Sequence, residues 1–163
     1  MPAQMYLVAD GLPGRLWIMP RPQSETLPQQ MEVCREAGMD HLVSMLEPEE
    51  AVLLGLAEEA RHCAAAGMSF HTHPITDFGL PELPSFTALT QQINVWLAQG
   101  LGVGVHCRGG IGRSGMVTAG VLMVKGQSAQ DAITTVSVAR GSTIPDTVEQ
   151  GNFLSSFEKC FSV

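Results

Sequence analysis

The segment HCRGGIGRSG, from His106 to Gly115, combines residue types that can bind an anion and attack it. Cys107 follows a short β-prone run, and Arg113 comes six positions after it, beyond three glycines. Successive backbone N–H groups of such a loop can point inward, and the start of a following helix adds unpaired donors and partial positive charge. The planar guanidinium of Arg113 can hold two oxygens of a tetrahedral oxyanion. We therefore expect an anion cradle above Cys107, in which the same field favours thiolate over thiol.

Strands and helices are expected to alternate around this loop. The hydrophobic patterns and turn residues predict strands at Tyr6–Ala9, Leu16–Met19, His41–Leu46, Met68–Ile75 and Val103–His106. They predict helices at about 28–37, 48–66, 85–99, 113–125, 129–140 and 147–160. This alternation favours an α/β fold, a single domain over residues 1–163 whose central, mostly parallel mixed sheet of about five strands has helices on both faces.

Three of these helices carry more detailed expectations. The long helix over 48–66 places Leu53, Leu56, Ala57, Ala60 and Ala64 at helical spacing, so this stripe should face the core. Ser85 is expected to cap the next helix. The helix over 113–125 is apolar on every side and should be almost completely buried.

Composition narrows the classes of partner. Lys plus Arg number 9 against 16 Asp plus Glu, a net charge of −7, which argues against nucleic acid and against an anionic membrane surface. No apolar run approaches the roughly 20 residues of a membrane-spanning helix, and no secretory leader is visible, so a cytoplasmic protein is expected. The four cysteines, Cys34, Cys63, Cys107 and Cys160, form no CxxC pair. Reduced thiols, no structural metal and no cofactor are therefore expected.

The loop sequence resembles the signature of the cysteine-dependent protein tyrosine phosphatases, His-Cys, five residues, then Arg and Ser or Thr. His106, Cys107, Arg113 and Ser114 match it. The resemblance implies that Cys107 attacks phosphorus to form a phosphocysteine, that Ser114 stabilises the departing thiolate, and that His106 braces the loop. It also implies that the phosphate oxygens are held by the loop residues, namely Arg108, Gly109, Gly110, Ile111, Gly112 and Arg113.

A second segment, HPITDFGLPE from His73 to Glu82, resembles the acid loop of the kinase-associated phosphatase branch of the dual-specificity enzymes. Transfer of a phosphoryl group from an oxygen leaving group requires a proton donor on a loop that faces the cradle. The resemblance assigns this role to Asp77, which would later accept a proton from the hydrolytic water. Asp131 and Asp146 are weaker candidates.

A third segment, RGSTIPDTVEQGNFL from Arg140 to Leu154, resembles the Arg-Gly-Ser and Thr-x-x-Gln pattern of the same branch. Gln150 shares a helical face with Phe153 and Leu154, so its amide should point inward. The resemblance implies that Gln150 positions the attacking water and that Arg140 braces the loops. The three segments together lead us to expect a metal-independent dual-specificity phosphatase acting on phosphorylated proteins.

Other residue patterns in the chain suggest further functions. Gly110, Gly112 and Gly115 form a GxGxxG pattern, but it overlaps the phosphate loop and comes late in a short chain, which argues against a dinucleotide site. His71 and His73 share a strand face but make an incomplete metal site. A phosphate-binding module without turnover is the main alternative, and it leaves Cys107 without a role. Sulfur transfer is a third, and it leaves Asp77 unexplained.

Overall fold

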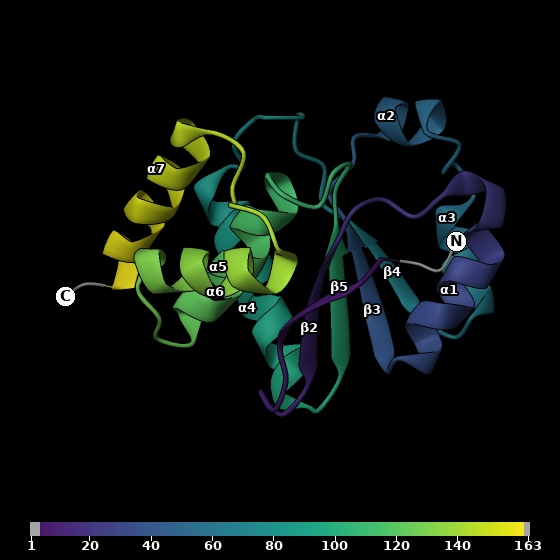
Figure 1. Cartoon of the computed structure of the whole chain (residues 1–163), viewed down its shortest axis with the longest axis horizontal. Helices are drawn as coiled ribbons and strands as arrows, with labels where there is room; N and C mark the ends of the chain where they lie inside the picture. Colours follow the sequence, from purple (N-terminus) through teal and green to yellow (C-terminus); the bar gives the residue numbers. More distant parts are fainter. Residues whose placement is uncertain (1–3, 162–163) are drawn as a thin grey trace.

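A five-stranded mixed sheet runs through the middle of the molecule (Figure 1). The structure is a computed structural model that describes residues 4–161. The sheet has the order β1-β2-β5-β3-β4. Its outer strand β1 pairs antiparallel with β2, and the other pairs are parallel. The strands are β1 Tyr6–Ala9, β2 Arg15–Met19, β3 Met39–Ser44, β4 Ser69–Thr72 and β5 Gly102–His106.

Helices cover both faces of the sheet and give the molecule two hydrophobic cores (Figure 1). Helices α1 Leu27–Glu36 and α3 Glu59–Ala65 pack on one face. The other face is covered by α4 Leu83–Ala98, α5 Arg113–Val124, α6 Ala129–Arg140 and α7 Val148–Glu158. The short α2 Pro48–Leu53 lies at the top edge in Figure 1, beside the loop that follows β5. The expected α/β architecture with about five strands is confirmed.

The expected long helix over 48–66 was wrong, because the chain forms α2 and α3 with a break between them. Gly55 lies in the break with φ +73°, a conformation that cannot continue a right-handed helix. The break also exposes most of the expected apolar stripe. Leu53 is 82% exposed, and Leu56 alone in that stripe is buried.

The remaining helices lie close to their expected positions. Ser85 does not cap α4, which begins two residues earlier with Pro84 in its first turn; the Ser85 hydroxyl donates to the Glu82 carbonyl instead. Helix α5 is buried from Arg113 to Met123, as expected. Short 3-10 helices at Ser24–Thr26 and Lys159–Phe161 complete the elements. Within residues 4–161, no helix is both long and apolar enough to span a membrane.

Candidate active site

The loop between β5 and α5 surrounds the sulfur of Cys107 with hydrogen-bonding groups. The buried β5 leads directly into it, and α5 begins at Arg113. The Gly110 N–H donates to Cys107 Sγ at 3.3 Å, and the Ser114 hydroxyl lies 3.1 Å from the same sulfur. Gly110 has φ +72°, and a Cβ there would lie 2.6 Å from the Met19 carbonyl carbon. The loop geometry therefore requires glycine at this position.

Arg113 is fixed at the start of α5 although it is only 1% exposed. Its two terminal nitrogens donate to the two carboxylate oxygens of Glu50, at 2.7 and 2.9 Å. One nitrogen also donates to the Ile75 carbonyl at 2.9 Å, and the other donates to Asp77 Oδ1 at 3.1 Å. The guanidinium is thus oriented from two separate segments of the chain before any substrate binds.

Glu50 is a site residue that the sequence did not reveal. It belongs to a capping box with Glu47 at the start of α2, and Arg108 Nε also lies 3.2 Å from its carboxylate. The hydrogen bonds from Arg113 hold the pKa of Glu50 below its ordinary value of 4.5 and outweigh the opposite effect of burial. Acidic residues at the start of a helix are expected from the helix dipole alone. Nothing in the sequence therefore indicated that Glu50 contacts the loop.

His106 forms a buried ion pair behind the loop. Its Nε2 lies 2.5 Å from Glu59 Oε2, and its Nδ1 lies 3.1 Å from the Cys107 carbonyl oxygen. Burial lowers the pKa of His106, but the charge and hydrogen bond of Glu59 and the Cys107 carbonyl together raise it above 6.5. His106 therefore lies in the position expected of a loop brace, and Glu59 is its partner, which the sequence did not indicate.

The loop that carries Asp77 is held on both sides of that residue, by Arg113 at the start of α5 and by Gln150 in α7. The Arg113 guanidinium donates to the Ile75 carbonyl, and the Gln150 amide donates to the Gly79 carbonyl at 3.2 Å. The Asp77 carboxylate contacts Arg113 between these two attachments. Asp131 is exposed in the first turn of α6 and forms no contact with this loop among the described residues.

Two residues of the third sequence segment hold neighbouring loops in place. Arg140 donates to the carbonyls of Gly110 at 3.0 Å and Gly109 at 3.1 Å, and its guanidinium stacks on Tyr6. Gln150 is fully buried, and its carbonyl oxygen accepts from the backbone N–H groups of Asp146 and Thr147. Both ends of the Gln150 amide are therefore engaged, and its expected contact with water stays a prediction.

The family comparison agrees with this geometry. Residues 19–127 match the family model described as "Polymorphic toxin system, DSP-PTPase phosphatase", which denotes dual-specificity and protein tyrosine phosphatases. The chain belongs to this phosphatase family. The matched residues include β5, the phosphate loop, the acid loop and all of α5. The resemblance stated from the sequence is thereby confirmed.

Part of the chain is also similar to curated proteins. It is 34% identical to cyclin-dependent kinase inhibitor 3 of Sus scrofa over 93 residues, and 33% identical to the Homo sapiens protein over the same length. Each alignment covers 56% of this chain and 44% of the relative, so the chain matches less than half the length of these curated proteins.

Solved structures share the fold over nearly the whole phosphatase. A kinase associated phosphatase whose catalytic cysteine is replaced by serine has a TM-score of 0.88 at 21% identity, with coverage of 100% of this chain and 98% of that one. Tk-PTP in its active form has a TM-score of 0.79 at 27% identity, with coverage of 95% and 96%. The tyrosine phosphatase-like fold is confirmed.

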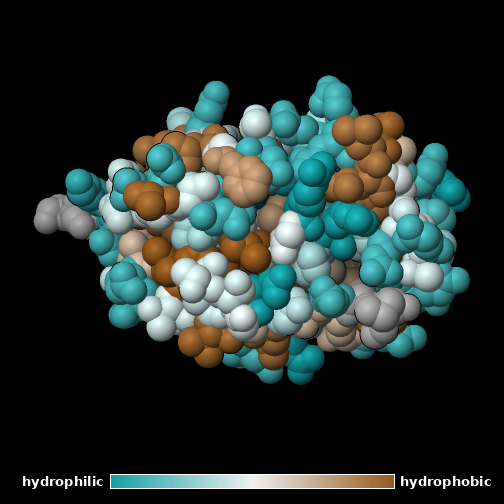
Figure 2. Space-filling view, turned by 45° about the horizontal axis from the view of Figure 1, so that its top comes forward, coloured by the Kyte–Doolittle hydropathy of each residue, from teal (hydrophilic) through white to brown (hydrophobic). Residues whose placement is uncertain are grey.

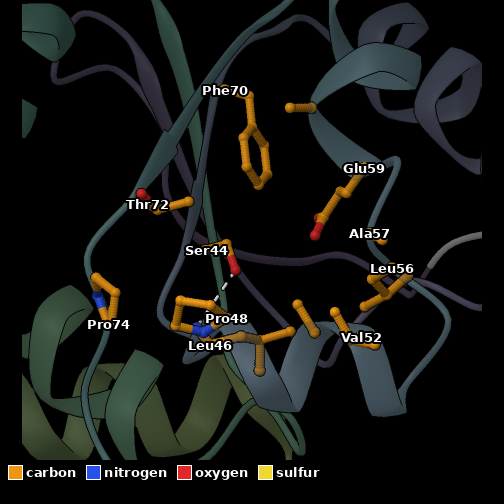
Figure 3. A pocket seen from close by; sticks show the side chains of 12 residues that line it. Ser44, Leu46, Pro48, Val52, Leu56, Ala57, Glu59, Phe70, Thr72 and Pro74 are labelled. Atoms are coloured by element: carbon orange, nitrogen blue, oxygen red, sulfur yellow. Dashed lines mark hydrogen bonds between the residues drawn. The ribbon is translucent and has the colours of Figure 1, made fainter.

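A separate, mainly apolar pocket of about 300 Å³ includes Glu59 in its lining, which comes from β3, β4, α2, α3 and the segments beside them (Figure 3). Figure 3 shows Glu59 and Ser44 directed into it among apolar side chains such as Leu56 and Phe70. Hydrophobic surface also covers the neighbouring α2 in Figure 2, where Val52 and Leu53 are exposed. Within residues 4–161, no group of three or more His, Cys, Asp or Glu side chains could hold a metal ion.

Proposed function

We propose that this chain hydrolyses phosphate monoesters of proteins, both phosphotyrosine and phosphoserine or phosphothreonine, through a phosphocysteine intermediate and without a metal. The convergence of Cys107 Sγ, the Gly110 N–H, the Ser114 hydroxyl and the Arg113 guanidinium at one loop carries the proposal. Membership of the chain in the phosphatase family supports the same chemistry. A phosphorylated protein or peptide is the proposed partner.

In the first step, Cys107 Sγ attacks phosphorus in line with the leaving oxygen. A sulfur–phosphorus bond forms and the phosphorus–oxygen bond to the substrate breaks. Arg113 and the loop N–H groups hold the other three oxygens, whose charge they stabilise in the transition state. Asp77, which contacts Arg113 in the free protein, gives up that contact to the phosphate. In its protonated form it then gives its proton to the leaving oxygen, while its loop stays attached at Ile75 and Gly79.

In the second step, water attacks phosphorus from the side that the leaving group has vacated. Asp77, now a carboxylate, accepts a proton from that water as the new oxygen–phosphorus bond forms. The sulfur–phosphorus bond breaks and Cys107 leaves as a thiolate. The Ser114 hydroxyl, 3.1 Å from the sulfur, donates a hydrogen bond that stabilises the thiolate. The products are inorganic phosphate and the restored enzyme.

Substrate breadth is proposed from the open surroundings of the acid. Phe78, Leu80 and Leu83 beside Asp77 are exposed rather than packed into a wall around it. Both a long phosphotyrosine and a short phosphoserine can then approach the loop. Because Cys107 must stay reduced to react, we also propose a reducing, cytoplasmic location. The other three cysteines are likewise unbridged.

Hydrolysis of p-nitrophenyl phosphate and of phosphopeptides in excess EDTA tests the proposal. The expected result is turnover by the wild type and by the control variant Cys160→Ser. Cys160 is exposed and lies on the 3-10 helix after α7. Cys107→Ser should show none while still binding inorganic phosphate. Phosphate binding without turnover by the folded, reduced wild type would instead establish the phosphate-binding module.

A further inference from the structure

A second carboxylate, that of Asp146, borders the cradle in addition to Asp77. Asp146 lies in the connection between α6 and α7, two residues before Val148. Its Oδ2 is so close to the backbone of Gly112 that a Cβ added there would lie 2.5 Å from it. Gly112 is the loop residue immediately before Arg113. Asp146 is therefore in contact with the phosphate loop itself.

The position of Asp146 is set by its backbone. Its N–H donates to the buried Gln150 carbonyl oxygen at 3.0 Å. The same Gln150 amide reaches Gly79 of the acid loop, so one side chain fixes the relative position of the segments that carry Asp77 and Asp146. Within residues 4–161, no side-chain or backbone donor holds the Asp146 carboxylate, which is exposed to solvent. The backbone of Asp146 is thus fixed beside the loop, and its carboxylate is open to a water molecule.

The electrostatics agree with this placement. Partial burial raises the pKa of Asp146, the nearby charge of Asp77 raises it further, and Arg113 offsets part of the effect. The Asp146 carboxylate lies beside Gly112 of the loop, and Gln150 joins its segment to the one that carries Asp77. The Gln150 carbonyl oxygen is already engaged by two backbone N–H groups, so Asp146 offers an acceptor at this edge of the loop that Gln150 does not.

We propose that Asp146 is a catalytic residue of the second step, where it accepts a hydrogen bond from the water that attacks the phosphocysteine. This inference rests on the proposed function. The attacking water has two protons. One passes to Asp77 as the oxygen–phosphorus bond forms, and the other remains on the oxygen, hydrogen-bonded to Asp146, until the phosphate leaves. Two acceptors on the water align its oxygen lone pair with the sulfur–phosphorus bond that breaks.

Rapid-quench kinetics with p-nitrophenyl phosphate separate the two steps. For Asp146→Ala we expect an initial burst of p-nitrophenol close to one per enzyme, followed by a steady rate reduced about 10- to 100-fold. KM should fall in parallel, so kcat/KM changes little. Asp146→Asn keeps an acceptor oxygen and should recover most of the rate. Glu149→Ala, an exposed neighbour in the first turn of α7, is the control and should resemble the wild type.

A second readout distinguishes water alignment from a general structural effect. Added ethanol competes with water for the phosphocysteine and yields ethyl phosphate. Loss of Asp146 should shift the products toward ethyl phosphate, whereas a merely loosened site would slow both reactions alike. An unchanged burst and unchanged product ratio in an active Asp146→Ala enzyme would overturn the inference and leave the phosphatase function intact. Absence of turnover by the wild type would instead overturn the proposed function.

Discussion

At the scale of single residues, the site depends on Glu50 as much as on the signature that the sequence displays. Two carboxylate oxygens hold two guanidinium nitrogens of Arg113, which fixes the plane in which phosphate oxygens can be bound. The same carboxylate reaches Arg108 on the loop. We therefore expect Glu50 to act as a positioning residue that affects substrate through the two arginines.

Replacement of Glu50 tests this role. In Glu50→Gln only one oxygen remains to accept from Arg113, and the charge that favours the pair is lost. We expect kcat/KM for p-nitrophenyl phosphate to fall about 10- to 100-fold, with weaker competitive inhibition by inorganic phosphate. Glu49→Gln, one position away and exposed, should leave both values unchanged. Equal values for Glu50→Gln and wild type would contradict the assigned role.

The acid role of Asp77 predicts a dependence on the leaving group. Asp77→Asn should reduce kcat/KM about 10²- to 10⁴-fold for a phosphoserine peptide, whose alkoxide leaves only with a proton. The reduction should be much smaller for p-nitrophenyl phosphate, because its phenoxide is a good leaving group. Asp131→Asn serves as the control, since Asp131 lies on the exposed start of α6. A uniform reduction across both substrates would show that Asp77 acts on binding rather than as the acid.

At the scale of elements, the break between α2 and α3 allows two buried carboxylates to reach the phosphate loop. Glu50 and Glu59 are nine residues apart, so on one continuous helix of about 3.6 residues per turn they would project from opposite sides. With the chain turned at Gly55, Glu50 holds Arg113 and Glu59 holds His106. Apolar residues keep helical spacing across the break, so the sequence predicts one continuous helix. The break depends on tertiary contacts, which a local pattern does not show.

Gly55 is therefore expected to be sensitive to substitution. Gly55→Ala places a Cβ in the left-handed region and 2.8 Å from the Ser24 Cβ, so the free energy of unfolding should fall by about 1–3 kcal/mol. Chemical denaturation monitored by circular dichroism measures it. Gly151→Ala is the matched control, because Gly151 lies within α7 with open space at its Cβ. That variant should be neutral or more stable. Equal stability of Gly55→Ala and wild type would be inconsistent with this explanation of the break.

The elements that the sequence did predict are those with a local cause. The strand, glycine-rich loop and apolar helix around Cys107 follow from periodicity and turn residues, and α6 ends at Arg140 before Gly141, which has positive φ. The signature spacing also placed Cys107, Arg113 and Ser114 together. The contacts of Glu50, Glu59 and Asp146 join segments distant in sequence, and no local pattern records which charged side chain will meet the loop.

At the scale of the whole molecule, the His106–Glu59 pair connects the end of β5 to α3 across one layer of the fold. Both side chains are buried, so the pair contributes to stability only while both charges are present. The pKa of His106 is raised in the folded protein. The stabilisation from the His106–Glu59 pair is therefore fully present below the pKa of an unfolded histidine, about 6.5. It is lost as pH rises through the raised pKa of His106 in the folded protein.

The expected pH dependence can be measured by comparison with Glu59→Gln. At pH 6 the free energy of unfolding of this variant should be about 3–5 kcal/mol lower than that of the wild type. The difference should shrink as pH rises through the folded pKa of His106. Glu58→Gln breaks an exposed pair with Arg61 and should change stability by less than about 1 kcal/mol at any pH. A difference for Glu59→Gln that is constant with pH would refute the assignment of charge to this pair.

The proposed phosphocysteine can be detected directly on Cys107 during turnover. The wild type is mixed with p-nitrophenyl phosphate, quenched in acid within the first turnover, digested and analysed by peptide mass spectrometry. We expect one phosphoryl group, on the peptide that contains Cys107, and none in Cys107→Ser. Hydrolysis that proceeds at the same rate in Cys107→Ser, or a phosphoryl group on any other residue, would contradict the proposed phosphocysteine.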